Sequence, residues 1–182
     1  MNTTVKFAKV KEGAIIPSKR DEDAGFDIYA CFDEDYMVLY PHETKLIPTG
    51  IASACSPEYA LILRERGSTG SKGIALRAGV VDSGYRNEIF VGLTNTTSKV
   101  LFISKLSEEE TFKNYDKDCD EFGACKYMRR VTPPRFVYPY SKAIAQILIV
   151  PVPHVAVEEI SYDELKAIKS ERGMNALGSS NK

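Results

Sequence analysis

The chain has 182 residues, of which 43% are hydrophobic and 27% are charged, as expected of a globular chain with a sizeable core. Its 24 Lys and Arg residues balance 25 Asp and Glu residues, so it lacks the basic excess that duplex DNA binding requires. Neither an H-E-x-x-H nor a C-x-x-C pattern is present, which excludes the usual zinc spacings.

The N-terminal residues contain no apolar segment followed by a small-residue cleavage site, so no signal peptide is predicted. The longest apolar stretch, Ile144–Val152, is far shorter than the ~20 residues that span a bilayer. We therefore expect a cytoplasmic protein without a membrane segment. In that compartment the cysteines would be reduced thiols. They are Cys31, Cys55, Cys119 and Cys125.

Most segments have the composition of short β-strands, rich in β-branched residues and separated by Gly, Pro, Ser and Asp. The predicted strands are Val5–Val10, Tyr36–Leu39, Lys45–Ala52, Ala60–Arg64, Gly73–Leu76, Glu88–Thr94 and Ala143–Val152. This pattern predicts an all-β sandwich or barrel. The missing alternation of strands and helices disfavours a doubly wound sheet.

One short helix is predicted near the C-terminus, where Ser161 and Glu164 have the spacing of a capping box. Leu165 and Ile168 follow at helical spacing, and the helix should end near residues 169–170. The remaining segment, at about 170–182, is polar and contains glycine. We expect a flexible arm there, which is either a frayed tail or a segment that folds over a ligand.

Residues at about 99–137 interrupt the strand pattern and are interpreted as an insertion in a single domain of residues 1–182. Their first part is acidic and predicts a helix around residues 107–115, whereas Lys126, Arg129 and Arg130 reverse the charge. A solvated surface excursion is one interpretation. An element that binds a protein partner is the other.

Four further segments have residue types suited to chemistry. The loop Arg66–Lys72 combines glycines, hydroxyls and cations, a composition typical of phosphate binding, although ordinary loops share it. In Gly79–Tyr85 the Asp82 carboxylate follows two valines and is a candidate general base, whereas a plain β-hairpin turn is the alternative. Asp27 alternates with apolar neighbours, and Gln146 lies inside an apolar run, where a buried amide needs partners.

Together and in order, five motifs resemble those of the trimeric dUTP diphosphatases (dUTPases). They are Asp-Ala-Gly-Phe-Asp at 23–27, Arg-Gly-Ser at 66–68, Gly-Val-Val-Asp-Ser-Gly-Tyr at 79–85, Ile-Ala-Gln-Ile at 144–147, and Arg-Gly with a later Gly-Ser-Ser at 172–180. The resemblance implies a jelly-roll-like distorted β-barrel and a homotrimer. Each active site would draw on more than one subunit and be closed by the C-terminal arm.

The resemblance also implies a function: dUTP is hydrolysed to dUMP and pyrophosphate, which keeps uracil out of DNA and supplies dUMP for thymidylate synthesis. Asp82 would position the attacking water. Tyr85 would pack on the deoxyribose and exclude a 2′-hydroxyl. The backbone around Val80–Ile89 would recognise uracil. The implied substrate-binding residues are Arg66, Gly67, Ser68, Val80, Val81, Tyr85, Ile89, Gln146, Arg172, Leu177, Gly178, Ser179 and Ser180.

Water would attack the α-phosphorus in line, so catalysis would consist of positioning and charge neutralisation. By the same resemblance, Asp27 would hold hydrated Mg²⁺ through water. Mg²⁺ retains waters and pairs with phosphates, so few protein ligands are needed.

The chain departs from the family pattern in three motifs. The second motif is usually Arg-Ser-Gly, whereas here the hydroxyl is one position later, at Ser68. The fourth motif usually begins with Gly-Asp, whereas here Ser141 and Lys142 precede it. Leu177 stands where an aromatic residue usually covers uracil, so the aromatic stacking geometry is lost.

Two alternatives remain. The related dCTP deaminases need a general acid/base Glu on the strand after the third motif, but the corresponding residue here is Gly92. A regulatory protein of the same fold would bind a protein partner through residues 99–137. Asp82, Tyr85 and Arg172 argue against an inactive scaffold but do not exclude such a second role.

Overall fold

The computed structural model describes residues 4–122, 134–170 and 173, and side chains are not described for residues 120–122. The described elements are β1 (Lys6–Lys9), β2 (Phe26–Ile28), β3 (Tyr36–Leu39), β4 (Thr44–Pro48), β5 (Ile51–Ala54), β6 (Tyr59–Arg64), α1 (Gly67–Gly70), β7 (Ile74–Arg77), β8 (Val80–Val81), β9 (Phe90–Asn95), β10 (Val100–Ser104), α2 (Glu108–Phe122), β11 (Arg135–Pro139), β12 (Ala145–Pro151) and α3 (Tyr162–Ala167). The chain divides into two compact units, residues 1–152 and 153–182.

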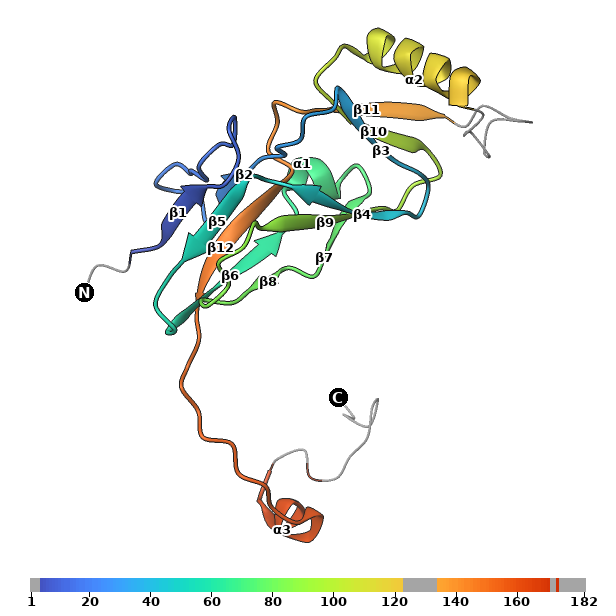
Figure 1. Cartoon of the computed structure of the whole chain (residues 1–182). Helices are drawn as coiled ribbons and strands as arrows, with labels where there is room; N and C mark the ends of the chain where they lie inside the picture. Colours follow the sequence, from blue (N-terminus) through green and yellow to red (C-terminus); the bar gives the residue numbers. More distant parts are fainter. Residues whose placement is uncertain (1–3, 123–133, 171–172, 174–182) are drawn as a thin grey trace. The chain divides into compact units, whose positions relative to one another are not determined.

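The strands of the first unit pair into four small sheets (Figure 1), with the orders β1-β5, β11-β10-β3, β2-β12-β6-β8 and β4-β9-β7. All of these pairings are antiparallel except that of β10 with β11. The prediction of a mostly β chain is therefore confirmed. Over the described residues, these pairings do not form a closed barrel.

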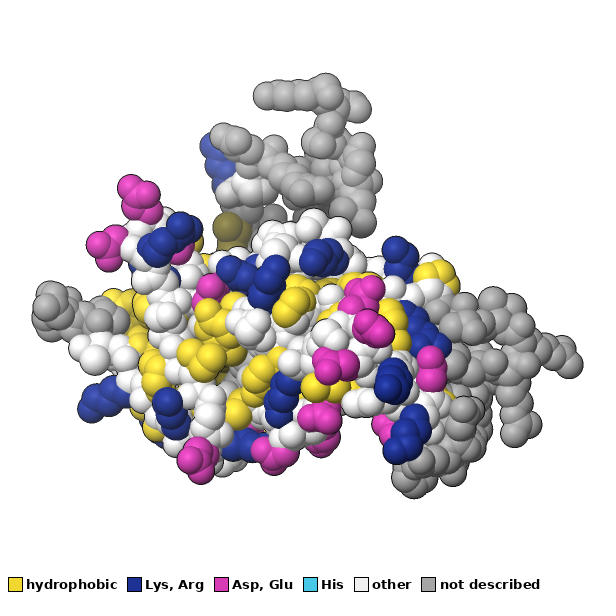
Figure 2. Space-filling model, turned by 90° about the horizontal axis from the view of Figure 1, so that it is seen from above, with side chains coloured by type: hydrophobic (Ala, Val, Ile, Leu, Met, Phe, Trp, Pro, Cys, Tyr) yellow, Lys and Arg dark blue, Asp and Glu magenta, His cyan; other side chains and the backbone are white. Residues whose placement is uncertain are grey.

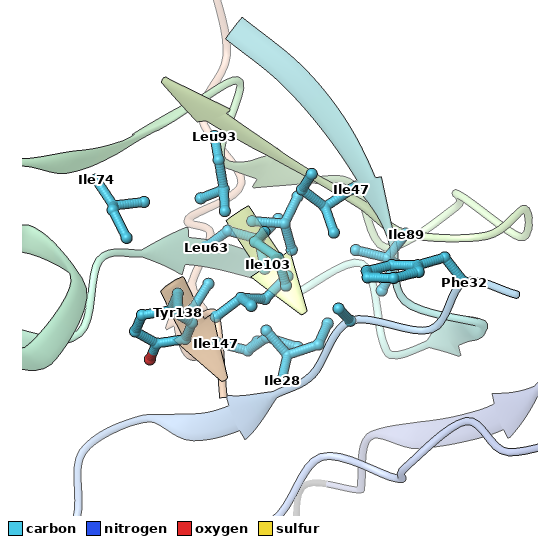
Figure 3. Packing of buried hydrophobic residues seen from close by; sticks show 14 of the residues in the cluster. Ile28, Phe32, Ile47, Leu63, Ile74, Ile89, Leu93, Ile103, Tyr138 and Ile147 are labelled. Carbon is cyan, nitrogen blue, oxygen red and sulfur yellow. The ribbon is translucent and has the colours of Figure 1, made fainter. Parts of the chain in front are cut away.

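Large aliphatic side chains from several sheets form the main hydrophobic core. Figure 3 shows Ile28 of β2, Leu63 of β6 and Ile147 of β12 pointing into this core, together with Leu93 of β9 and Ile103 of β10. Each of these five side chains is no more than 2% exposed. Cross-strand neighbours lie on the same face of a sheet, and successive residues of a strand alternate between faces. Since one face of the β2-β12-β6 sheet is buried, the alternate residues of these strands lie on the opposite face.

The segment Lys45–Ala52, predicted as one strand, is two strands in different sheets, and the prediction was wrong on this point. The break falls at Thr49 and Gly50. Gly50 has a φ of 66°, a left-handed conformation that interrupts an extended strand at little cost only for glycine. The buried Thr49 hydroxyl donates a hydrogen bond to the Ile89 carbonyl at 2.6 Å, which ties this corner to the start of β9.

Strands β10 and β11 lie at the two ends of the predicted insertion, and α2 lies between them. The α2 helix extends the helix predicted around residues 107–115. Its aromatic side chains Phe112 and Tyr115 pack with Phe102 of β10, and Tyr115 is only 5% exposed. A salt bridge of 2.8 Å between Asp116 and Arg135 adds a polar link to β11. The insertion is thus fixed to the β11-β10-β3 sheet by its first helix.

In the second unit, α3 begins as the sequence predicts. The backbone N–H of Glu164 donates to the Ser161 hydroxyl at 3.2 Å, and the Glu164 carboxylate accepts from the Ser161 N–H at 2.8 Å. This capping box is therefore confirmed. Apart from residues 170 and 173, the predicted flexible arm lies outside the described residues.

Two general expectations can be compared with the structure. No helix in the described part of the chain is long and apolar enough to cross a membrane. Cys31 and Cys55 are free, as expected, but Cys119 is disulfide-bonded, so the expectation of a reduced thiol was wrong for that residue. On the face shown in Figure 2, basic and acidic side chains are interspersed, in keeping with the balanced composition.

Candidate active site

The register of one sheet brings Asp27 and Gln146 together. On β12, Gln146 pairs with Asp27 of β2 on one side and with Arg64 of β6 on the other. Their neighbours Ile28 and Leu63 point into the core, so these three polar side chains lie on the opposite face. The sequence-based expectation that Asp27 points away from its apolar neighbours therefore agrees with this geometry.

After β6 the chain does not form the open loop expected at Arg66–Lys72. It turns at once into α1, a single helical turn. The Arg66 N–H donates to the Thr69 hydroxyl at 3.0 Å, and the Gly70 N–H donates to the Arg66 carbonyl at 2.9 Å. The Thr69 side chain is buried, whereas Gly67 and Ser68 are exposed. The exposed hydroxyls of this segment are therefore those of Ser68 and Ser71.

Arg66 and Asp27 form an ion pair in this structure. The Arg66 Nε lies 2.8 Å from Asp27 Oδ1, and Nη2 donates to Oδ2 at 3.1 Å, so the contact is bidentate. Arg66 Nη1 also donates to the Ser68 hydroxyl at 3.3 Å. About 30% of each charged side chain is exposed, which leaves both accessible to a bound anion or cation.

The Gln146 side chain is fixed by a hydrogen bond and by a close glycine. Its Nε2 donates to the Glu65 carbonyl at 2.8 Å. On the other side, a Cβ built on Gly25 would lie only 2.5 Å from Gln146 Oε1, so any larger residue there would displace the amide. The Leu76 N–H in turn donates to the Glu65 carboxylate at 2.8 Å and lowers the pKa of that carboxyl. Gln146 Oε1 thus lies against Gly25, and Gln146 is the cross-strand neighbour of Asp27.

These groups line a cleft of about 610 Å³, which we call the Asp27 cleft. Its lining residues are Ser18, Lys19, Arg20, Asp23, Ala24, Gly25, Asp27, Arg66, Gly67, Ser68 and Gln146. The residues predicted from the first, second and fourth motifs are therefore brought together. The cleft has three cationic side chains against two carboxylates, Asp23 and Asp27, so its excess positive charge suits an anion.

Sequence reasoning missed Lys19 and Arg20 in this cleft. The Lys19 ammonium lies over the Phe26 ring, 5.5 Å from its centroid. Arg20 pairs with Asp23 through Nε at 2.9 Å, and this hydrogen bonding lowers the pKa of the Asp23 carboxyl. Their only signal in the sequence was the run of charged residues next to the first motif. When the fold is not known, such a run predicts a solvated turn.

The donor set of the Asp27 cleft fits a hydrated Mg²⁺ rather than a directly ligated metal. Within the described ranges, no three His, Cys, Asp or Glu side chains gather closely enough to hold a metal ion. The cleft nevertheless offers oxygen acceptors from Asp27 and Gln146, next to cations that attract phosphates. Mg²⁺ typically keeps several waters and pairs with phosphate oxygens, so such a sparse oxygen set is sufficient.

Asp82 and Tyr85 lie in a second cleft of about 250 Å³, which we call the Asp82 cleft. Its lining residues are Leu46, Ala78, Val80, Val81, Asp82, Tyr85, Ile89 and Phe90. The structure therefore places all the residues implied by the third motif in one cleft. Asp82 is exposed, and the backbone N–H of Tyr85 donates to the Asp82 carbonyl at 3.0 Å, which closes a tight turn.

The third motif is not a paired hairpin, and that interpretation of Gly79–Tyr85 was wrong. Strand β8 pairs with β6, whereas β9 pairs with β4 and β7, so the two strands belong to different sheets. The tight turn at residues 82–85 therefore lies between two strands that do not pair with each other. Val80 is 66% exposed and Leu46 is 60% exposed, so the cleft presents apolar surface to whatever occupies it.

The two clefts share no lining residue, and β6 explains their separation. Its Arg64 end borders the Asp27 cleft, since Arg64 pairs with Gln146. At the other end, Leu61 pairs with Val81, the residue before Asp82. Three residues along a strand span ~10 Å. Arg66 and Asp82 thus line different clefts of the described chain.

The fifth motif cannot be placed in either cleft. Its predicted binding residues lie outside the described residues: Arg172, Leu177, Gly178, Ser179 and Ser180.

Comparison with solved structures shows that the fold is that of dUTPases. The dUTPase of Staphylococcus bacteriophage 80alpha, solved with dUPNHPP, aligns with a TM-score of 0.68 at 22% identity, covering 98% of this chain and 99% of that one. The dUTPase from phage phi11 of S. aureus, whose species-specific insert was visualised, aligns with a TM-score of 0.62 at 19% identity, covering 86% and 96%.

Sequence comparison places the chain in a family. The family model described as dUTPase matches residues 11–107. A deoxyuridine 5′-triphosphate nucleotidohydrolase of Neisseria meningitidis serogroup B is 40% identical over 106 residues, covering 54% of this chain and 70% of that protein. The Pol polyprotein of equine infectious anemia virus is 37% identical over 95 residues, covering 48% of this chain and 8% of the polyprotein. This chain belongs to the dUTPase family.

Proposed function

We propose that the protein hydrolyses dUTP to dUMP and pyrophosphate. The observation that carries this proposal is the grouping of Asp82 and Tyr85 in one cleft with Val80, Val81 and Ile89, in a chain of the dUTPase family. The activity makes the protein a hydrolase of nucleotide metabolism. By removing dUTP it would keep uracil out of DNA and supply dUMP.

In the proposed reaction, Asp82 orients a water molecule and accepts its proton as the water attacks the α-phosphorus. An exposed carboxylate at the end of a short strand is suited to this role, since its turn is closed by a backbone hydrogen bond. Tyr85 packs against the deoxyribose and leaves no room for a 2′-hydroxyl. The cleft's apolar walls exclude water from the base and sugar.

The Asp27 cleft would bind the phosphate chain. Arg66 would exchange part of its ion pair with Asp27 for phosphate oxygens, and the exposed Ser68 hydroxyl and Gly67 backbone would add donors. Mg²⁺, when bound, neutralises phosphate charge and favours the leaving of pyrophosphate. Asp27 and the Gln146 oxygen would then accept hydrogen bonds from its waters. The release of Asp27 from Arg66 frees the carboxylate for that purpose.

A homotrimer would complete the active site. The separation of the two clefts supports this proposal, because in one chain Asp82 and the phosphate-binding residues line different clefts. A neighbouring copy would supply the missing half. The C-terminal arm, with Arg172, Leu177 and residues 178–180, would cover the joined site. The same proposal includes the family's jelly-roll-like closure of the four sheets.

The deaminase alternative is disfavoured by the surroundings of Gly92. A Cβ built on this residue would lie 2.9 Å from the Arg77 carbonyl oxygen, which is backbone and does not yield easily. The position that would carry the deaminase Glu therefore accepts no side chain without movement of β7 or β9.

Several expectations stay predictions. They are the single domain of residues 1–182 with an insertion at about 99–137, a protein partner bound through that insertion, and a cytoplasmic location. The packing of α2 on β10 and β11 means that a partner would meet the helix face turned away from the sheet.

Turnover with dUTP, dTTP, dCTP and UTP tests the proposed function, with pyrophosphate and ammonia as readouts. We expect pyrophosphate from dUTP only and no ammonia from dCTP. The Asp82→Asn variant should lose turnover by ~10²–10⁴-fold, as is typical for a lost general base, while still binding nucleotide. Near-normal turnover in this variant would refute the role of Asp82. Ammonia release from dCTP would support the deaminase instead.

A further inference from the structure

The turn that carries Asp82 and Tyr85 is held by the side chain of Arg86, the residue directly after the third motif. Arg86 Nη1 donates to the Ser83 carbonyl at 2.5 Å and to the Tyr85 carbonyl at 3.0 Å. The same nitrogen lies 3.4 Å from the Ser53 carbonyl of β5. One guanidinium therefore bridges two carbonyls of the turn to a neighbouring strand.

A second set of contacts holds the other end of the same turn. The Tyr85 hydroxyl donates to the Glu88 carbonyl at 2.9 Å, and the Glu88 carboxylate accepts from the Gly50 N–H at 2.7 Å. The Ile89 N–H donates to the Ile51 carbonyl at 2.8 Å. Tyr85 is therefore held at two points. Its hydroxyl is bonded to the Glu88 carbonyl, and its backbone carbonyl accepts from Arg86.

We propose that Arg86 is a positioning residue that sets the discrimination of dUTP against UTP by fixing Tyr85 relative to β5. The proposal rests on the proposed function. The Tyr85 ring excludes a 2′-hydroxyl only if the ring cannot move away from the sugar. Tyr85 is 39% exposed, so packing alone does not fix its position. Charge-assisted hydrogen bonds are stronger than neutral ones, and a guanidinium provides several donors in a fixed plane.

This role differs from direct binding of substrate. Arg86 Nη1 points to three backbone carbonyl oxygens, and Arg86 is absent from the lining of the Asp82 cleft. If Arg86 instead bound a phosphate, its loss would raise KM equally for both nucleotides. Loss of a positioning contact would instead lower the ratio of kcat/KM for dUTP to kcat/KM for UTP, because the contact of Tyr85 with the 2′ position changes.

The test measures kcat and KM for dUTP and UTP in the wild type, Arg86→Ala, Arg86→Lys and the charge-matched control Lys99→Ala, which removes an exposed cation before β10. In Arg86→Ala we expect the preference for dUTP over UTP to fall about tenfold, the size expected from lost hydrogen bonds to a charged group. The Lys variant keeps the charge but loses the planar arrangement of donors, so its preference should lie between those of the wild type and Arg86→Ala. Lys99→Ala should retain all of it.

An unchanged preference in Arg86→Ala, or an equal rise of KM for both nucleotides, would overturn the proposal. If the Ala variant does not fold, Arg86→Gln takes its place with the same two outcomes. Amide hydrogen exchange of residues 83–89 provides a readout independent of activity: exchange should be faster in the variant, and unchanged exchange would refute the anchor. A wild type without dUTP turnover would refute the proposed function, while the exchange measurement would still decide whether Arg86 holds the turn.

Discussion

Gly25 leaves room for the Gln146 amide, so replacing it with alanine should damage the phosphate-binding cleft from within. A Cβ on Gly25 would lie 2.5 Å from Gln146 Oε1, 2.9 Å from its Cβ and 3.0 Å from its Cδ. The first contact is shorter than real Cβ atoms tolerate, and the second is to the stem of the side chain. Rotation of the amide alone therefore cannot relieve the overlap.

The magnitude follows from what Gln146 must give up. A displaced amide loses its hydrogen bond to the Glu65 carbonyl, and overpacking of this kind typically costs ~1–3 kcal/mol of the free energy of unfolding. For a chain of this size each 1 kcal/mol lowers the melting temperature by about 2–4 °C. Gly25→Ala should thus melt roughly 2–12 °C lower. Its kcat/KM for dUTP should fall about tenfold, because the acceptor beside Asp27 has moved.

Thermal unfolding and steady-state kinetics check this prediction, with two further variants. Gly70→Ala is the matched control, since a Cβ there meets only Glu65 Cβ at 3.6 Å, an ordinary contact. It should change neither quantity. The double variant Gly25→Ala with Gln146→Ala removes the contacts to Oε1 and Cδ but keeps the 2.9 Å contact to Cβ, so it should recover part of the melting temperature and no activity. Wild-type melting and turnover in Gly25→Ala would refute the reasoning.

Three further predictions follow. Tyr85→Ala should lower the preference for dUTP over UTP; if UTP is rejected as strongly as before, the sugar is recognised elsewhere. Lys19→Ala should raise KM for dUTP several-fold with kcat unchanged, because it removes a cation from the rim of the Asp27 cleft, and the shift should vanish at high salt. Removal of residues 170–182 should leave the fold intact and slow turnover, so undiminished turnover would show that the arm is only a tail.

The parts of the structure that sequence reasoning predicted depend on local chemistry. Ser161 and Glu164 form their capping box from neighbours three residues apart, whatever the rest of the chain does. The outward orientation of Asp27 follows from strand alternation once Ile28 is buried. These features need no knowledge of which strands pair.

The features that were missed depend on contacts between residues distant in sequence. The break at Gly50 accompanies a bond from Thr49 to Ile89, 40 residues away. The ion pair of Arg66 with Asp27 joins residues 39 apart and depends on β12 lying between β2 and β6. Strands of two or three residues, such as β2 and β8, are too short to carry a periodic signal.

The register along β6 leads to a prediction about assembly. Arg66 follows one end of this strand, and Asp82 lies near the other. A chain in which Asp82 is replaced therefore keeps an intact Asp27 cleft. A chain in which Arg66 is replaced keeps an intact Asp82 cleft. If active sites combine clefts from different copies, co-expressed Asp82→Asn and Arg66→Ala chains should recover activity that neither has alone.

Random assembly of equal amounts would place an intact phosphate cleft against an intact Asp82 cleft in about one quarter of the sites, so about a quarter of wild-type turnover is expected. A site built within one chain would recover none, since every chain in the mixture has one damaged half. Mixing the two purified variants without subunit exchange provides the control, and it should stay inactive until exchange is allowed. Absence of recovery in co-expressed, mixed oligomers would mean that one chain bends to join its own two clefts, against the separation that β6 imposes.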